Sequence, residues 1–521
     1  MGRREFLRHG TVLGMSIPML GAIGGASSAF AAGNAARNPG GTIRVGMSVP
    51  AGAIDPLTVA DTGGVCMVTQ TGEFLAVSTP DVGLVPQLAT SWKPNSDGSV
   101  WTFKIRSGVK FHNGQPMTAA DVVATIDRLA DPENGSVALS AFAGALSKGG
   151  SRLIDDATVE FRLDAPNGNF PYLVSSDNFN AVILPANYCG DFEKHFIGTG
   201  PFRLKKFTSR ARASFVPNAD YWGDTAFPDL TEFVFYDNVQ AQVLAMQGGQ
   251  LDMLLHVPVQ GSQALLDDPH LRVLSLKSSA HQELHMRTDR GPFADKRVRR
   301  ALALCLNREN LVKGLFRGRA SLGNDSPFAP VFASTDLATP QRHEDIPLAK
   351  GLLAQAGFAN GFAVTLTTER FLEIPDYAVV IQNAARRVGI DIRLNIEDQA
   401  SYYGGARFGQ SDWLDSTLGI EDYAHRGVPN TLLSATLGSS GPFNAAHFKN
   451  AAYDRLVGEY IAALDPASQR DIAGKIQRLL LEETPVIIGY FYDWLSVVKN
   501  NLTGVRATAS AALYLDRAHF I

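Results

Sequence analysis

The most constraining feature of this sequence is the alternation of short, apolar, β-branched segments with segments of helical periodicity. Alternation at this spacing predicts mixed α/β domains with partly parallel sheets. Strands are expected at 42–49, 101–105, 231–236, 362–367 and 390–396, with 486–499 as the last long strand. Helices are expected at about 118–129, 239–247 and 378–388, with further helices opening at 293–295, at 307 and at 347.

Several helix starts are marked by residues that satisfy free backbone groups. The Thr118 hydroxyl can cap a free N–H group, and Asp121 suits the positive end of the helix dipole. Asp295 and Asn307 are expected as N-caps of two successive helices, and Pro347 suits a first helical turn. These signals predict where individual helices begin within the alternating pattern.

The first 32 residues have the order of an export signal. A twin-arginine element, Arg3-Arg4, precedes an uncharged apolar run at 11–23, and an A-x-A cleavage site follows at 29–31. The run is too short, and too rich in Gly, to be a membrane-spanning helix. We therefore expect a twin-arginine signal peptide over residues 1–32, cleaved near Ala32. The alternative is a disordered basic N-terminus.

The compartment follows from the type of export signal. No cysteine follows the apolar run, so the lipid-anchored route through an N-terminal cysteine is closed. A freely diffusing exported protein is retained where an outer membrane encloses it. This favours a periplasmic protein of a Gram-negative cell, with a loosely held or secreted protein as the other interpretation.

Size and charge set further limits. Roughly 490 of the 521 residues would remain after cleavage, enough for two or three domains. The whole chain has a formal charge of −4, and the removed segment has three Arg against one Glu, a net of +2, which leaves −6. A nucleic-acid-binding surface needs a concentrated basic field, so we expect no nucleic-acid partner.

The three cysteines are few and widely spaced. Cys66, Cys189 and Cys305 form no CxxC or metal-type spacing. One disulfide with one free thiol is possible, and so are three buried reduced thiols.

Familiar catalytic motifs are absent from the sequence. It contains no GxxxxGK loop, no G-x-S-x-G elbow and no HExxH motif. His281 and His285 are four residues apart, but in strand-like surroundings the two imidazoles need not converge on one ion. We expect packed or solvated histidines, no metal, no cofactor and no enzyme activity.

A series of segments resembles the family 5 solute-binding proteins of ABC importers, the peptide- and nickel-binding group. The matches follow the family's order and cover nearly all of the predicted mature chain. No single motif is catalytic, but the series together is specific. The segments are LATSW at 88–92, WTFKIRSGVKFHNG at 101–114, TAADV at 118–122, GTGPF at 198–202, NADYWG at 218–223, LAMQGGQLD at 244–252, PFADKRVR at 292–299, NRENLV at 307–312, AKGLLAQAGFANGF at 349–362 and the apolar strand at 485–492.

For the fold, this resemblance implies an α/β, two-lobed periplasmic-binding-protein-like structure of type II, a hinged clamp, with an extra domain inserted in the first lobe. Two crossover strands would form the hinge, and the lobes would close over a ligand. The resemblance places lobe I at 33–64, 195–290 and 496–521, the inserted domain at 65–194 and lobe II at 291–495.

The resemblance also suggests ligand-binding residues. Asp422 and Tyr423 stand where peptide-binding members carry an Asp-Tyr whose carboxylate pairs with a ligand's α-ammonium group. Burying a cation without such a partner is costly. Tyr490 and Tyr492 resemble aromatic residues near the family's cleft, and strand alternation puts both on one face. Ala51 lies where the first strand leads into a loop at the cleft edge.

The chain departs from the family pattern near these residues. Gly419 replaces a Trp that often precedes the Asp-Tyr, and Glu421 adds a second carboxylate beside Asp422, with His425 and Arg426 following. We include Gly419 and Glu421 among the predicted ligand-binding residues. The ligand could then be a dipeptide, an opine-like conjugate, a sugar derivative or a cationic solute. Asp422 as a turn or helix cap, and the tyrosines as a packed core strand, are the structural alternatives.

The expected function is that of a periplasmic substrate-binding component of an ABC transporter. It would capture a peptide or peptide-like solute and deliver it to a membrane permease. The partners implied are the permease and cytoplasmic ATPase subunits, and the chain itself is expected to be a monomer. The alternatives are a twin-arginine-exported enzyme containing a cofactor, and a chemosensory or chaperone-like solute binder without transport.

Overall fold

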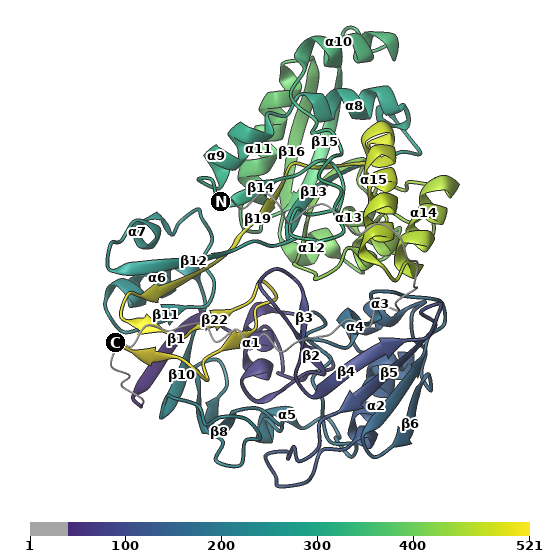
Figure 1. The fold of residues 1–521 in the computed structure, drawn as a ribbon. Coiled ribbons are helices and arrows are strands. Elements are labelled where there is room, and N and C mark those ends of the chain that lie inside the picture. The colour runs from purple at the N-terminus through teal and green to yellow at the C-terminus, as the bar shows by residue number, and fades with distance from the viewer. Residues whose placement is uncertain (1–39) are drawn as a thin grey trace, which may run out of the picture.

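The computed structural model describes residues 40–521, so the predicted signal peptide lies outside the described residues. Within this range the chain forms three larger sheets, each at the centre of a separate body (Figure 1). We call the body around the seven-stranded sheet the first lobe, the body around the five-stranded sheet the second lobe, and the body around the four-stranded sheet the inserted domain. The predicted mixed α/β architecture is confirmed.

The first lobe is built on a mixed seven-stranded sheet. Its central strand, β1, pairs in parallel with β10 and β11, and β20 returns antiparallel from near the C-terminus. Helix α6 (Val239–Gln247) packs against β1 and β10. The order is β12 (Leu271–Leu276), β20 (Trp494–Lys499), β11 (Met253–Leu254), β1 (Thr42–Ser48), β10 (Leu230–Tyr236), β9 (Arg212–Pro217) and β8 (Phe202–Thr208).

The second lobe is built on a five-stranded sheet covered by helices. Strand β15 pairs in parallel with β16 and β17, whereas β13 pairs antiparallel with β17 and β18. The order is β16 (Ile390–Glu397), β15 (Phe362–Glu369), β17 (Leu418–Tyr423), β13 (His281–Met286) and β18 (Val486–Ile488). The longer helices are α8 (Lys296–Leu304), α9 (Arg308–Leu315), α10 (Ile346–Gln355), α11 (Ile374–Arg386), α14 (Ala451–Ala462) and α15 (Pro466–Glu483).

The inserted domain contains an antiparallel four-stranded sheet and one long helix, α2 (Ala119–Ala130). The sheet order is β4 (Ala89–Pro94), β5 (Val100–Ile105), β7 (Thr158–Arg162) and β6 (Ser151–Asp155). Helix α1 (Thr62–Thr71) precedes the hairpin of β2 (Ala76–Ser78) and β3 (Leu84–Pro86). The remaining pairs are β14 (Ala320–Leu322) with β19 (Tyr490–Tyr492), β21 (Leu502–Thr503) with β24 (His519–Phe520), and β22 (Arg506–Ala507) with β23 (Leu513–Tyr514).

The predicted helix caps are confirmed. Thr118 and Asp121 form a reciprocal capping box at the start of α2. Asp295 accepts a hydrogen bond from the backbone N–H of Arg297, and Asn307 accepts one from Asn310. Helix α11 begins at Ile374, four residues before the expected start, because Pro375 suits the first turn.

The expected single strand at 486–499 is wrong: the segment forms β18, β19 and β20, which belong to three different sheets. The chain leaves the second lobe after β18 and enters the first lobe at β20. The change of sheet falls at Gly489 and Asp493, where the ladder is interrupted. A continuous apolar pattern specifies burial along the whole segment but not which sheet each part joins.

This segment runs beside a second crossing between the lobes. The backbone N–H of Tyr492 donates to the carbonyl of Ala280 at 3.0 Å, and Lys277 Nζ lies 3.0 Å from Asp493 Oδ1. Strand pairing therefore changes sheet near 277–280 and near 493, ahead of the predicted lobe limits at 290/291 and 495/496. The residue limits of the lobes stay a prediction.

All three cysteines are free. Cys66 and Cys305 are buried, and Cys189 is exposed. Burial raises the pKa of the two buried thiols, that of Cys305 to about 12. Of the two alternatives left open by the sequence, the structure has three reduced thiols, one of them at the surface.

Candidate ligand-binding site

A cavity of about 670 Å³ lies between the two lobes, beside the two crossings near 277–280 and 493, which together we call the hinge. Small-molecule sites typically enclose about 300–1,000 Å³. The first lobe contributes the ends of β1 and β11 and the starts of α1 and α6. The second lobe contributes the ends of β15 and β17, and the hinge contributes Ala280 and Tyr492.

The position of the cavity follows from strand direction. Ser48 ends β1, Glu369 ends β15, and Asp422 is the last but one residue of β17. All three line the cavity. In open α/β sheets, ligands bind outside the carboxyl ends of the parallel strands, where side chains of neighbouring strands converge.

Asp422 is the predicted residue that the structure places most directly in this cavity. The hydroxyl of Tyr492 donates to Asp422 Oδ1 at 2.9 Å. Burial raises the pKa of Asp422 to about 8, the Tyr492 hydrogen bond opposes this rise, and the charge of Glu369 adds to it. The carboxyl group is therefore poised to gain or lose a proton near neutral pH.

Glu369 is a second carboxyl group at the cavity, on the neighbouring strand. It accepts hydrogen bonds from the Tyr403 hydroxyl at 2.6 Å and from Gln399 Nε2 at 2.5 Å. Burial raises its pKa above the ordinary range. Arg370 follows directly, and its exposed side chain has no hydrogen-bond or ion-pair partner among residues 40–521. The cavity therefore presents carboxyl groups and an unpaired cation from one wall.

Two uncharged imidazoles also line the cavity. His256 stacks on Trp494, with ring centroids 4.1 Å apart, and burial lowers its pKa to about 4. His425 Nδ1 accepts a hydrogen bond from the backbone N–H of Ser279 at 3.0 Å, and burial lowers its pKa to about 3. Both rings are neutral near pH 7, and because His425 Nδ1 accepts from Ser279, the Nε2–H of His425 is left as a donor.

Strand alternation separates Asp422 from three predicted neighbours. Gly419, Glu421 and Tyr423 lie on the opposite face of β17, directly across from His285, Glu283 and His281 of β13. None of the three lines the cavity.

The packing inside the second lobe explains the residue types at 419, 421 and 423. Glu421 Oε2 lies 2.8 Å from His285 Nδ1. Burial raises the pKa of Glu421 and lowers that of His285 to about 4, so it disfavours the charged form of both groups. Gly419 leaves room for the His285 ring, since a Cβ there would lie 2.4 Å from His285 Cε1. Tyr423 packs on His281, with ring centroids 5.6 Å apart.

The two predicted tyrosines share a face but not an environment. Both rings contact Phe316, which confirms the alternation. Tyr490 is fully buried, with its hydroxyl bonded to Gln282, whereas Tyr492 reaches the cavity. Ala51 is exposed and does not line the cavity, although Val49, two residues earlier, does.

Sequence reasoning missed several cavity residues. Glu369 ends β15 and Arg370 follows it, and a strand was predicted there at 362–367, so the rule on carboxyl ends of strands could have found both residues. His256 and Trp494 carry no comparable signal, because their stacking joins segments more than two hundred residues apart.

Comparison with known proteins decides the family. The model of the bacterial extracellular solute-binding proteins, family 5, matches residues 83–434, more than half of the chain. The chain belongs to this family. The resemblance seen in the sequence motifs is thereby confirmed.

Two similar relatives are named for the peptide-like solutes that they bind. The dipeptide-binding protein DppE of Bacillus subtilis is 25% identical over 460 residues, 81% of each chain. The glutathione-binding protein GsiB of Escherichia coli is 25% identical over 484 residues, 87% of this chain and 89% of the relative. The match runs through both lobes and the inserted domain.

Solved structures support the fold. The periplasmic binding protein DppA of Helicobacter pylori, in complex with the peptide STSA, has a TM-score of 0.75 at 22% identity and covers 93% of this chain and 98% of its own. MppA, a murein tripeptide binding protein in an unliganded open form, has a TM-score of 0.77 at 22% identity, with the same coverage. The predicted two-lobed fold of type II, with an extra domain, is confirmed.

Two further features concern membranes and metals. Within residues 40–521, no helix combines the length and apolar character needed to cross a bilayer. In the same range, no group of three or more His, Cys, Asp or Glu side chains is arranged to hold a metal ion.

Proposed function

We propose that this protein is the periplasmic substrate-binding component of an ABC importer and captures a peptide or peptide-like solute with a free α-ammonium group. The observation that carries this proposal is the Asp422 carboxyl group, which faces a cavity closed by both lobes. Tyr492 occupies one acceptor position of this carboxyl group. The other positions are available to the N–H donors of an ammonium group.

The charges around the cavity favour a zwitterionic ligand. Asp61, Glu369 and Asp422 supply carboxyl groups, and Arg370 supplies a guanidinium group without a partner in the described chain. An Arg guanidinium can bind a carboxylate through two parallel hydrogen bonds. A short peptide that carries an ammonium group at one end and a carboxylate at the other matches both features.

The names of the relatives support this ligand class. One is a dipeptide-binding protein, another binds glutathione, and a solved structural relative holds the peptide STSA. The open form of MppA indicates that this fold exists without its ligand in a second arrangement. Closure of the lobes around a bound solute buries it, and the closed form would be the state that a permease recognises.

The other parts of this proposal come from the sequence. The twin-arginine segment would export the folded protein, and cleavage near Ala32 would release it into the periplasm as a monomer. The permease and the ATPase subunits would complete the importer. Capture breaks no bond in the ligand.

A binding experiment tests the proposal. Native mass spectrometry of the purified protein should detect a co-purifying solute, and titration calorimetry should detect binding of trialanine or glutathione. A micromolar Kd corresponds to about −8 kcal/mol. N-acetyl-trialanine, which lacks the ammonium group, is the matched control ligand. Equal affinity for the free and acetylated peptides would contradict the role of Asp422.

A further inference from the structure

The inserted domain and the second lobe are in direct contact, away from the hinge. The backbone N–H of Gly168 donates to the carbonyl of Ile461 at 2.8 Å. Asn169 Nδ2 donates to Asn430 Oδ1 at 2.9 Å, and Gln469 Nε2 donates to Asn169 Oδ1 at 3.1 Å. The side chains of Asn169, Asn430 and Gln469 are buried. Separation of the two bodies would break this hydrogen-bonded contact.

An apolar side chain reinforces the contact. Val82, at the tip of the β2–β3 hairpin, packs into a core cluster of the second lobe that includes Phe328 and Leu433. Its backbone φ is +54°, a strained value for a β-branched residue, and the Tyr172 hydroxyl holds its carbonyl at 2.8 Å. Such strain persists only where the surroundings over-determine the conformation. The hairpin tip is therefore specifically shaped to enter the second lobe.

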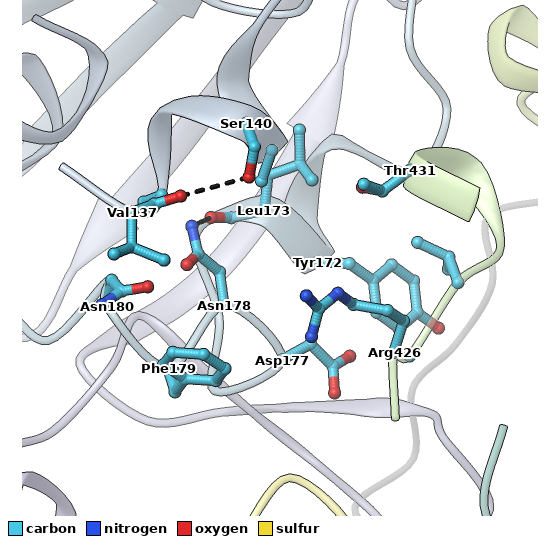
Figure 2. A pocket seen from close by; sticks show the side chains of 14 residues that line it. Val137, Ser140, Tyr172, Leu173, Asp177, Asn178, Phe179, Asn180, Arg426 and Thr431 are labelled. Carbon is cyan, nitrogen blue, oxygen red and sulfur yellow. Dashed lines mark hydrogen bonds between the residues drawn. The ribbon is translucent and has the colours of Figure 1, made fainter. Parts of the chain in front are cut away.

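A small cavity of about 60 Å³ lies in the same contact (Figure 2). It is lined by Asp177 of the inserted domain and by Arg426 and Gly427 of the second lobe. Among the described residues, 40–521, neither carboxyl oxygen of Asp177 has a hydrogen-bond partner, although both are buried. A Cβ at Gly427 would lie 1.8 Å from Asp177 Oδ2, so only glycine allows this approach.

The same segment of the second lobe reaches both this contact and the ligand cavity. Asp422 and His425 line the cavity between the lobes, whereas Arg426, Gly427 and Asn430 face the inserted domain. Because Asn430 is only eight positions after Asp422, the position of one end restrains the other.

We propose that Asp177 and Gly427 are positioning residues for ligand capture: docking of the inserted domain at this contact fixes the 422–430 segment, and with it Asp422, in the ligand-binding arrangement. The inserted domain would then contribute to ligand binding and would not be only an addition to the first lobe. This inference rests on the proposed capture of a solute between the lobes. Coupling between two such sites typically changes affinity about 5- to 150-fold.

The first test measures docking without any ligand. Cys189 is an exposed thiol on the inserted domain, and Leu337, which is 76% exposed, allows Leu337→Cys on the second lobe. Fluorescence energy transfer between dyes at these two positions reports their separation. Gly427→Ala places a methyl group against Asp177 and should lower the transfer efficiency. Its own backbone is not left-handed, so alanine adds no strain there.

Three further variants make this result specific. Gly458→Ala on α14 is the matched control, because an added Cβ meets nothing within 4 Å, and it should leave the transfer efficiency unchanged. Gly427→Ala combined with Asp177→Ala removes the clash but also the charge that faces Arg426, so its efficiency should equal that of Asp177→Ala alone. Unchanged transfer in Gly427→Ala, or a double variant with lower transfer than Asp177→Ala alone, overturns the docking contact.

The second test measures ligand affinity with trialanine as the probe. Gly427→Ala should weaken binding about 5- to 150-fold, the double variant should recover part of this loss, and Gly458→Ala should bind like the unaltered protein. A purely structural role would lower the melting temperature and leave affinity unchanged, and that outcome overturns the positioning role. If trialanine fails to bind the unaltered protein, peptide capture is what fails, and the energy-transfer comparison still decides the docking contact.

Discussion

Asp422 has the environment of a group that exchanges a proton when it binds a cation. Burial and the charge of Glu369 raise its pKa to about 8, against the hydrogen bond from Tyr492. An ammonium group beside the carboxylate would favour the ionised form and lower this pKa again. The ligand thus supplies a positive charge directly beside this carboxylate.

We expect the affinity for trialanine to depend on pH because of this carboxyl group. Below about pH 8 most Asp422 is protonated, so binding to an ammonium group must release a proton. The affinity should therefore rise with pH, by at most about tenfold per unit, until pH approaches 8. Above that pH the α-amino group itself loses its proton and binding should weaken. Calorimetry in buffers of different ionisation enthalpy counts the released proton, and a count of zero at pH 6.5 would contradict this role.

Replacement of Asp422 tests the same carboxyl group directly. Asp422→Asn keeps the shape but removes the charge-assisted bond, which contributes about 1.5–3 kcal/mol. The Kd for trialanine should rise by about 10- to 150-fold, with thermal stability nearly unchanged. N-acetyl-trialanine should bind both proteins alike, and an equal loss for both peptides would show that the substitution acts on the cavity rather than on the ammonium group.

Tyr492, in the hinge, lowers the pKa of Asp422 through its hydrogen bond. Its hydroxyl stabilises the ionised carboxylate, so Tyr492→Phe should raise the pKa of Asp422 further. The rise of affinity with pH should shift to higher pH in this variant. Tyr453→Phe is the control, because Tyr453 is buried in the second lobe and its hydroxyl bonds the carbonyl of Leu433. An identical pH profile in Tyr492→Phe and the unaltered protein would exclude this coupling.

At the scale of elements, β17 shows how one strand serves two purposes. One face carries Asp422 toward the ligand cavity, and the other packs Gly419 and Glu421 against the histidines of β13. The contact between Glu421 Oε2 and His285 Nδ1 pairs two buried polar side chains inside the sheet. This packing holds the end of the strand in place.

Gly419→Ala tests the packing of β17 on β13. The new methyl group would meet the His285 ring at 2.4 Å, which forces the ring or the strand to shift. Overpacking of this kind typically destabilises by about 1–3 kcal/mol. Chemical denaturation should therefore show a lower free energy of unfolding for Gly419→Ala than for the unaltered protein, whereas Gly458→Ala, inside α14, should be at least as stable as the unaltered protein. A Gly419→Ala variant as stable as the unaltered protein would show that the ring moves aside freely.

For the whole molecule, capture between lobes joins ligand binding to stability and shape. A ligand at 100 times its Kd stabilises the folded protein by about 2.7 kcal/mol. We expect trialanine to raise the melting temperature of the unaltered protein and to have a much smaller effect on Asp422→Asn. Small-angle scattering should show a more compact molecule with trialanine than without it. No change in either measurement at saturating peptide would contradict closure around the ligand.

The sequence by itself determined the local structure and the family. Caps such as Thr118 and Asn307, and the periodicity of β1, β15 and β16, act within a few residues, so the pattern predicts them directly. The ordered motifs likewise predicted two lobes with an inserted domain. Asp422 and Tyr492 were predicted from the resemblance to the family, and strand alternation placed Tyr492 on the same face as Tyr490.

Tertiary structure decided the division of 486–499 among three sheets, the separation of Asp422 from Glu421 and Tyr423, and the pairing of His256 with Trp494. It also brought Asp177 against Gly427, 250 positions further along the chain. Each of these depends on which segments meet in space. A local pattern records whether a side chain is buried, but the partner that buries it comes from elsewhere in the chain.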